Sequence, residues 1–150
     1  MDGKRAPRHS AWREGSVLGI LVATTIWVWV AGVDALAGEP LRTFRVLGGV
    51  VPFTLLHYVL NVAYAVAVVA ALHGAAREPS LLTGVAFGFF IIEFGFVMLT
   101  LLLSHLGLGE LAWVRILGGN VVGAGVGGWR LFRTHPVARE FRAADRQESE

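Results

Sequence analysis

Apolar residues occur in four long runs along the chain, and short polar or glycine-containing connections separate these runs. Residues 15–33 and 46–76 contain no Asp, Glu, Lys or Arg, and residues 82–104 contain only Glu93. A mainly apolar run of about 20 residues is long enough to cross a bilayer as a helix. The pattern therefore predicts an all-α integral membrane protein with four spans, at about residues 16–37, 53–73, 80–105 and 111–132.

The first run also resembles the core of a secretory signal peptide, because Ala35, Leu36 and Ala37 match the small-residue pattern of a cleavage site. The apolar core of a signal peptide is usually about 7–15 residues long, and residues 15–33 exceed that length. We therefore expect this run to be a transmembrane span with Asp34 at its far end.

The connections between the runs are short, and short connections favour antiparallel neighbouring helices. Pro52 and Pro79 stand near the starts of the second and third runs, where proline suits the first turn of a helix. We expect one domain, an antiparallel four-helix transmembrane bundle. Residues 1–14 and 133–150 are polar tails, the second of which is either an amphipathic surface helix or a solvated segment.

Basic residues are distributed unequally between the two sides of the predicted bundle. Ten of the 13 Lys and Arg residues fall in the N-terminal tail, the second connection and the C-terminal stretch from Arg130 onward, whereas Arg42, Arg45 and Arg115 fall on the other side. Cytoplasmic segments carry the excess of basic residues in membrane proteins. We therefore expect both termini in the cytoplasm of a multi-pass inner-membrane protein. Such charges suit anionic lipid headgroups, so the expected partner is the bilayer and not nucleic acid.

The composition narrows the possible chemistry. Only 16% of the residues are charged, against about 25% in a typical soluble domain. The chain has no cysteine, which excludes disulfides, thiol nucleophiles and cysteine-based metal sites. The sequence contains no dinucleotide-binding, phosphate-binding or zinc-protease motif and no recognisable nucleophilic triad. An enzymatic activity is therefore not expected.

Polar residues within the spans identify a candidate ligand- or ion-binding site. His57, Asn61 and Tyr64 share one face of the second span by their spacing, and Asn120 lies in the fourth. A rise of about 1.5 Å per residue places His57 about 7 Å, Asn61 and Asn120 about 13 Å, and Glu93 about 18 Å from the outer side. These side chains are expected to form one polar cluster that ends at Glu93.

Glu93 has three interpretations, because an ionisable residue within a span is costly and indicates function by default. It is a neutral acid that holds helices together, or the titrating group of a proton- or ion-coupled binding site. The third interpretation is a metal or haem site that uses His57 with Glu93 or His105. Metal sites usually need three or four ligands, so no cofactor is predicted.

Small residues predict close helix packing, because glycine lets helix backbones approach in lipid. The fourth span repeats glycine at every fourth position, and the third span adds a pair. This glycine face either packs within one bundle or contacts a second copy or another membrane subunit. The residues are Gly119, Gly123, Gly127, Gly84 and Gly88.

Two functions follow as hypotheses. The first is small-ligand binding or proton- or ion-coupled transport around Glu93. The alternative is a non-catalytic accessory subunit of a larger membrane complex. Both agree with an expected homo-oligomer or hetero-oligomer.

Overall fold

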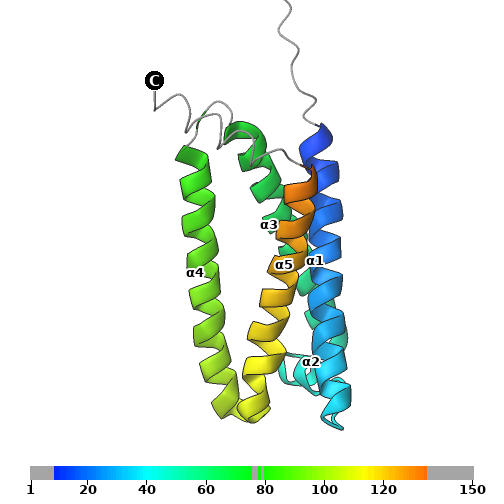
Figure 1. The fold of residues 1–150 in the computed structure, drawn as a ribbon. Coiled ribbons are helices and arrows are strands. Elements are labelled where there is room, and N and C mark those ends of the chain that lie inside the picture. The colour runs from blue at the N-terminus through cyan, green and yellow to red at the C-terminus, as the bar shows by residue number, and fades with distance from the viewer. Residues whose placement is uncertain (1–8, 76–77, 79, 135–150) are drawn as a thin grey trace, which may run out of the picture.

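The computed structural model describes residues 9–75, 78 and 80–134, and every regular element within these ranges is a helix. The predicted C-terminal surface helix and residues 1–8 of the basic N-terminal tail lie outside the described residues. Four longer helices are present, with shorter helical segments between the first and second and between the third and fourth of them (Figure 1). The elements are α1 (His9–Leu36), α2 (Arg42–Val46), α3 (Val50–Ala75), α4 (Ser80–Leu103), η1 (Ser104–Leu108), η2 (Gly109–Leu111), η3 (Trp113–Leu117) and α5 (Gly118–Thr134).

Three helices are long and apolar enough to cross a membrane: Ala11–Leu36, Val50–Gly74 and Thr83–Leu106. They agree with the first three predicted spans, although α1 begins seven residues before predicted residue 16. The fourth helix, α5, has 17 residues and is shorter than these spans. A π-helical segment, η3, precedes it directly, so the predicted fourth span 111–132 is divided between two helix types.

Glycines determine where α3 begins. Gly48 and Gly49 have φ angles of 101° and 109°, which residues with side chains rarely adopt. The first α-helical bond then runs from the Phe53 amide to the Gly49 carbonyl, at 3.1 Å. Pro52 lies within the first turn, where its missing N–H would have had no helical partner.

Helix α1 packs against both α3 and α5. Its contact with α3 is very close at Gly15 and Gly19. A Cβ atom at Gly15 would lie 2.5 Å from the Val66 Cα atom, and one at Gly19 would lie 2.5 Å from the Val62 Cα atom. No side chain fits in that space, so these two glycines allow the backbones of α1 and α3 to touch.

The predicted glycine repeat of α5 faces α1. A Cβ at Gly123 would lie 2.6 Å from Ile26, and one at Gly127 would lie 3.1 Å from Val22; Gly119 faces Ile26 and Trp29 at 3.3 Å and more. The α4 glycines have different surroundings, because a Cβ at Gly84 or Gly88 would meet no described atom within 4 Å. These α4 glycines therefore do not form the close contact with α5 that one sequence interpretation expected.

The first connection folds back onto the bundle. It was expected to be a short polar segment, but it contains α2, whose Phe44 and Thr43 are buried. The Phe44 ring lies 5.0 Å from the Trp27 ring and 5.3 Å from the Phe53 ring. Burial of one aromatic ring thus anchors a segment whose other residues are mostly polar.

The π-helical turn η3 is fixed by a tryptophan of α1. The Gly118 amide donates to the Trp113 carbonyl, and the Val114 carbonyl accepts a 2.8 Å hydrogen bond from Trp29 Nε1. A Cβ at Gly118 would lie 3.1 Å from this indole nitrogen. The wider turn and the glycine therefore let Trp29 bond directly to the backbone of η3.

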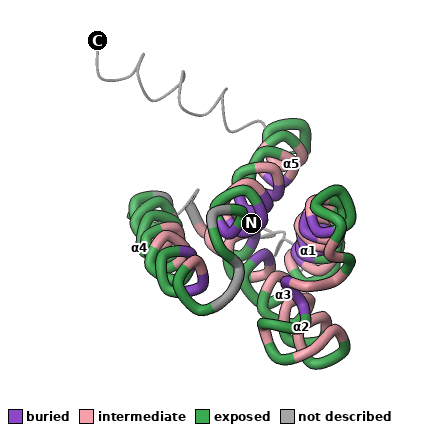
Figure 2. The backbone as a smooth tube through the Cα atoms, turned by 90° about the horizontal axis from the view of Figure 1, so that it is seen from below, coloured by how far each residue is buried: buried purple, intermediate pink, exposed green. Residues whose placement is uncertain are grey.

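Helix α4 is the least buried of the long helices. It packs against α3 and η3. Only 6% of its most apolar 18-residue stretch is buried, compared with 22% of the corresponding stretch of α1. Figures 1 and 2 show it standing beside the other helices, with exposed residues along most of its length. This placement leaves the inner face of α4 as one wall of a cavity.

A candidate intramembrane binding site

A cavity of about 410 Å³ runs along the inside of the bundle. Residues of α1, α3, α4, η3 and α5 line it, and on the last helix segment they extend from Ile116 to Leu131, a helical rise of about 20 Å. Its volume falls within the range of roughly 300–1,000 Å³ that small-molecule sites occupy. The cavity is therefore long, narrow and large enough for a small ligand.

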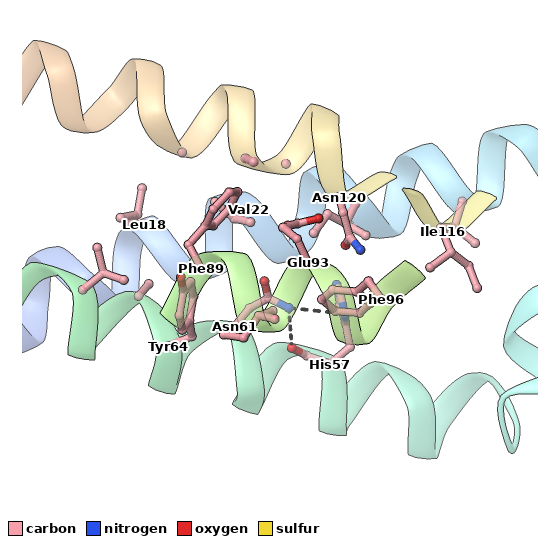
Figure 3. Close-up of a pocket in the computed structure, with 18 of the residues that line it drawn as sticks. Leu18, Val22, His57, Asn61, Tyr64, Phe89, Glu93, Phe96, Ile116 and Asn120 are labelled. Atoms are coloured by element: carbon pink, nitrogen blue, oxygen red, sulfur yellow. Dashed lines mark hydrogen bonds between the residues drawn. The ribbon is translucent and has the colours of Figure 1, made fainter. Parts of the chain in front are cut away.

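Most of the cavity wall is apolar, and a few polar groups interrupt it (Figure 3). All five residues that the sequence proposed for binding line this cavity: His57, Asn61, Tyr64, Glu93 and Asn120. The apolar wall includes Leu18, Val22, Ile26, Ala65, Val68, Val85, Phe89, Phe96 and Ile116.

His57 and Asn61 form a hydrogen-bonded pair on α3. His57 Nε2 lies 3.1 Å from the Ala23 carbonyl, which only accepts, so this nitrogen carries a proton. His57 Nδ1 then accepts from Asn61 Nδ2 at 3.3 Å, and Asn61 Nδ2 also donates to the His57 carbonyl at 2.9 Å. Both ring nitrogens are occupied, so the pair positions α3 against α1.

Glu93 projects from α4 into the cavity between two aromatic side chains of the same helix. Phe89 and Phe96 line the cavity with it, whereas Phe90 and Phe94 are exposed on other faces of α4. Asn120 of α5 lines the same cavity, and Figure 3 draws its amide next to the Glu93 carboxyl group in that view. Two aromatic rings of α4 thus lie beside Glu93 in the cavity wall.

Asn120 is the most unusual polar group of the cavity. Its side chain lies on α5 and the residue is only 8% exposed. Its Nδ2 atom is buried and has no hydrogen-bond partner among the described residues. A buried donor without a partner costs about 1–3 kcal/mol, so this amide is available for an acceptor that enters the cavity.

The histidines proposed for haem are not brought together. A metal or haem iron at His57 would have to replace one of the two hydrogen bonds of its ring. His105 is exposed in η1 and does not line the cavity. Among the described residues, no group of three or more His, Asp or Glu side chains is arranged to hold a metal ion.

A buried ion pair closes the end of the cavity that lies nearest α2. Arg115 Nε lies 2.8 Å from Asp34 Oδ1, and both side chains are completely buried. Asp34 also accepts 2.8 Å hydrogen bonds from the amide and the hydroxyl of Thr43. The sequence placed Asp34 at the far end of the first span and Arg115 on the same side of the bundle, but it did not identify the pair or the part played by Thr43.

Glu39 extends this ion pair toward the surface. Its carboxylate accepts a 3.1 Å hydrogen bond from Arg115 and also pairs with Arg42. The hydrogen bond from Arg115 has the largest effect on Glu39 and lowers its pKa below the ordinary value of 4.5. Burial raises this pKa by less than that hydrogen bond lowers it, and Arg42 lowers it further. Two arginines thus face two carboxylates, and the cluster carries little net charge.

Several positions that hold the helices together were not identified from the sequence. Gly15, Gly19 and the buried Ala23 of α1 repeat small residues at every fourth position, which is the same signal that identified the glycines of α5. Thr43 gave no recognisable signal, because its role depends on how α2 folds back onto Asp34.

Comparisons of this chain with protein-family models, with curated proteins and with solved structures found no match. The fold and the cavity define the class: a helical membrane protein with at least three helices of membrane-spanning length and an internal, mainly apolar cavity.

Proposed function

We propose that this protein binds a small, mainly apolar ligand in the cavity beside Glu93 and Asn120. One observation carries the proposal: a buried amide nitrogen without a partner among the described residues and a carboxyl group both line one long, mainly apolar cavity. Ligand sites commonly combine apolar walls with a few convergent polar groups. Glu93 supplies the group through which protons or ions couple to binding or transport.

The orientation in the membrane forms part of this proposal. The protein is a four-span, antiparallel inner-membrane protein with both termini in the cytoplasm, and η3 with α5 makes the fourth span. The beginning of α1 and the end of α5 lie at the same end in Figure 1, which supports an even number of spans. The excess of basic residues in the terminal tails supports the cytoplasmic side.

The accessory-subunit hypothesis is a second candidate, and the open surroundings of Gly84 and Gly88 on α4 favour it. In that case a partner helix, from a second copy or another membrane subunit, covers α4. A single monomeric species in mild detergent, with no co-purifying protein, would contradict it.

A hydrophobic carbodiimide tests the binding proposal. Dicyclohexylcarbodiimide is itself small and mainly apolar, and it adds a protonated carboxyl group across one of its C=N bonds. We expect mass spectrometry to find this adduct at Glu93 when the protein is treated in lipid nanodiscs, and Glu93→Gln to abolish it. Because the protonated acid is the form that reacts, the reaction rate measured between about pH 5 and pH 9 shows at which pH Glu93 is protonated within the folded protein.

Two glycines of α5 provide a matched pair of variants. A Cβ at Gly125 or Gly128 meets no described atom within 4 Å, but only Gly128 lines the cavity. Gly128→Leu therefore places a side chain in the cavity without a clash at its Cβ atom, and it should slow modification of Glu93 at least about tenfold, equivalent to roughly 1.4 kcal/mol. Gly125→Leu should react like the wild type. Equal rates in both variants would show that Glu93 is reached by another route, and the proposal would fail.

A further inference from the structure

The polar groups of the cavity define a chemical pattern, and the following inference rests on the proposed binding function. Asn120 Nδ2 is a donor without a described partner, so the ligand must offer an acceptor there. The Glu93 carboxyl group lines the same cavity, lies beside the Asn120 side chain in Figure 3, and accepts hydrogen bonds in either protonation state. A group that fits both side chains accepts from one and donates to the other.

A hydroxyl group has this property, because it provides one donor and two acceptor positions. A carbonyl accepts from Asn120, and also from Glu93 when that acid is protonated, but it offers no hydrogen to an ionised Glu93. An ammonium group would suit an ionised Glu93 but cannot accept from Asn120. A hydroxyl group suits both side chains in either protonation state of Glu93, and this favours a neutral head that both donates and accepts.

The shape and lining of the cavity beyond Asn120 indicate the chemistry of the rest of the ligand. From Asn120 to Leu131 the helical rise is about 16 Å. The α5 positions that line this part are small, with Ala124, Gly127 and Gly128 among them. Apolar side chains such as Leu18, Val68 and Val85 form the facing walls. This shape accepts a slim, extended hydrocarbon chain better than a compact ring system.

The surroundings of α4 indicate where such a ligand enters. This helix is the least buried of the three membrane-spanning helices, and Gly84 and Gly88 leave open space on it. The opposite end of the cavity is closed by the Asp34–Arg115 pair. A long apolar molecule is dissolved in the bilayer, so it reaches Glu93 from the side, past α4.

We infer that the ligand is a long-chain, hydroxyl-bearing lipid taken from the bilayer, with its hydroxyl group between Asn120 and Glu93 and its chain along α5. The head accepts from Asn120 Nδ2 and donates to the Glu93 carboxyl group. Asn120 is thus the residue that recognises the hydroxyl group of the ligand. The Ala124–Gly128 side of α5 lines the channel that holds its hydrocarbon chain.

Protection from the carbodiimide tests this inference. The probes are hexadecanol, hexadecane and octanol, each added at the same membrane concentration to the protein in nanodiscs. Hexadecanol should slow modification of Glu93 several-fold, whereas hexadecane lacks the hydroxyl and octanol lacks the chain, so both should protect much less. In Asn120→Leu, Glu93 should still react, but hexadecanol should no longer protect it better than hexadecane.

The outcomes separate the inference from the proposed function. Equal protection by hexadecane, or by octanol, would overturn the inference while Glu93 still reacts through the cavity. No protection by any probe would also overturn it and would indicate that water alone occupies the polar site. No modification of Glu93 without competitor would overturn both. Asn120→Leu removes a buried amide without a partner, so its melting temperature should equal or exceed that of the wild type; a lower value would assign Asn120 a structural role instead.

Discussion

Arg115 carries a positive charge with no exposed surface, and two carboxylates surround it. Asp34, its closer partner, lies in the last turn of α1, where the helix dipole disfavours a negative charge. Arg115 and the two hydrogen bonds from Thr43 offset that cost. The pair is therefore a fixed structural element, and removal of one member leaves the other charge buried and unpaired.

Arg115→Leu should reduce the free energy of unfolding by about 3–5 kcal/mol, because it leaves Asp34 buried without its ion-pair partner. Asp34→Leu combined with Arg115→Leu should cost less than Arg115→Leu alone, since no buried charge then remains. Chemical unfolding in detergent measures both. Arg45→Leu is the control, because Arg45 is exposed, and it should change stability by no more than about 0.5 kcal/mol. A double variant less stable than the single one would contradict this account.

Glu39 makes part of this stability depend on pH. Its pKa is lowered in the folded protein by the hydrogen bond from Arg115, so the folded state favours the ionised carboxylate. The contribution is fully present above the unfolded pKa and is lost as the pH falls through the lower folded value. The melting temperature of the wild type should therefore exceed that of Glu39→Gln near neutral pH, and the difference should shrink below about pH 4.5. A difference that stays constant down to the folded pKa would rule out this linkage.

At the scale of elements, the contact between α1 and α3 depends on two glycines, Gly15 and Gly19, because they have no side chain. Gly19→Ala would place a Cβ atom 2.5 Å from the Val62 Cα atom and 2.7 Å from the Asn61 carbonyl oxygen. These are backbone atoms of a long helix, so the two helices must move apart. The expected loss of stability is about 1–3 kcal/mol, measured by thermal denaturation.

Gly32→Ala is the matched control on the same helix, because its Cβ would meet no described atom within 4 Å. It should leave stability unchanged or raise it by up to about 1 kcal/mol, since alanine restricts the unfolded chain. Equal effects at Gly19 and Gly32 would mean that helix propensity, and not the approach of α3, determines the result.

The long apolar helices could be predicted because the length of an apolar run, and the absence of charged residues from it, can be read directly from the sequence. The five cavity residues could be proposed for the same reason: polar groups within apolar runs are conspicuous. The partner of each helix could not be deduced. The α5 glycines face α1 and not α4, since the choice depends on how Ile26 and Val22 fill the space above them. The helix α2 was missed because a single buried ring, Phe44, anchors an otherwise polar segment.

At the scale of the whole molecule, the proposed orientation can be read with a thiol reagent, because the chain contains no cysteine. Leu36 and Thr134 are exposed and lie at opposite ends of the bundle. In intact cells, a membrane-impermeant maleimide should label Leu36→Cys and not Thr134→Cys. After permeabilisation both should react. Labelling of Thr134→Cys in intact cells would reverse the orientation inferred from the basic residues.

The Asp34–Arg115 pair also imposes an order on biosynthesis. Asp34 belongs to α1, and Arg115 belongs to η3, which comes about 80 residues later along the chain and leads into α5. The acid therefore enters the bilayer before its partner has been made. In a nascent chain that has been made only as far as residue 114, the Asp34 carboxylate lies at the end of α1 without its arginine, and such a group is costly in lipid. The pair can therefore form only after Arg115 has been made and η3 has packed against α1.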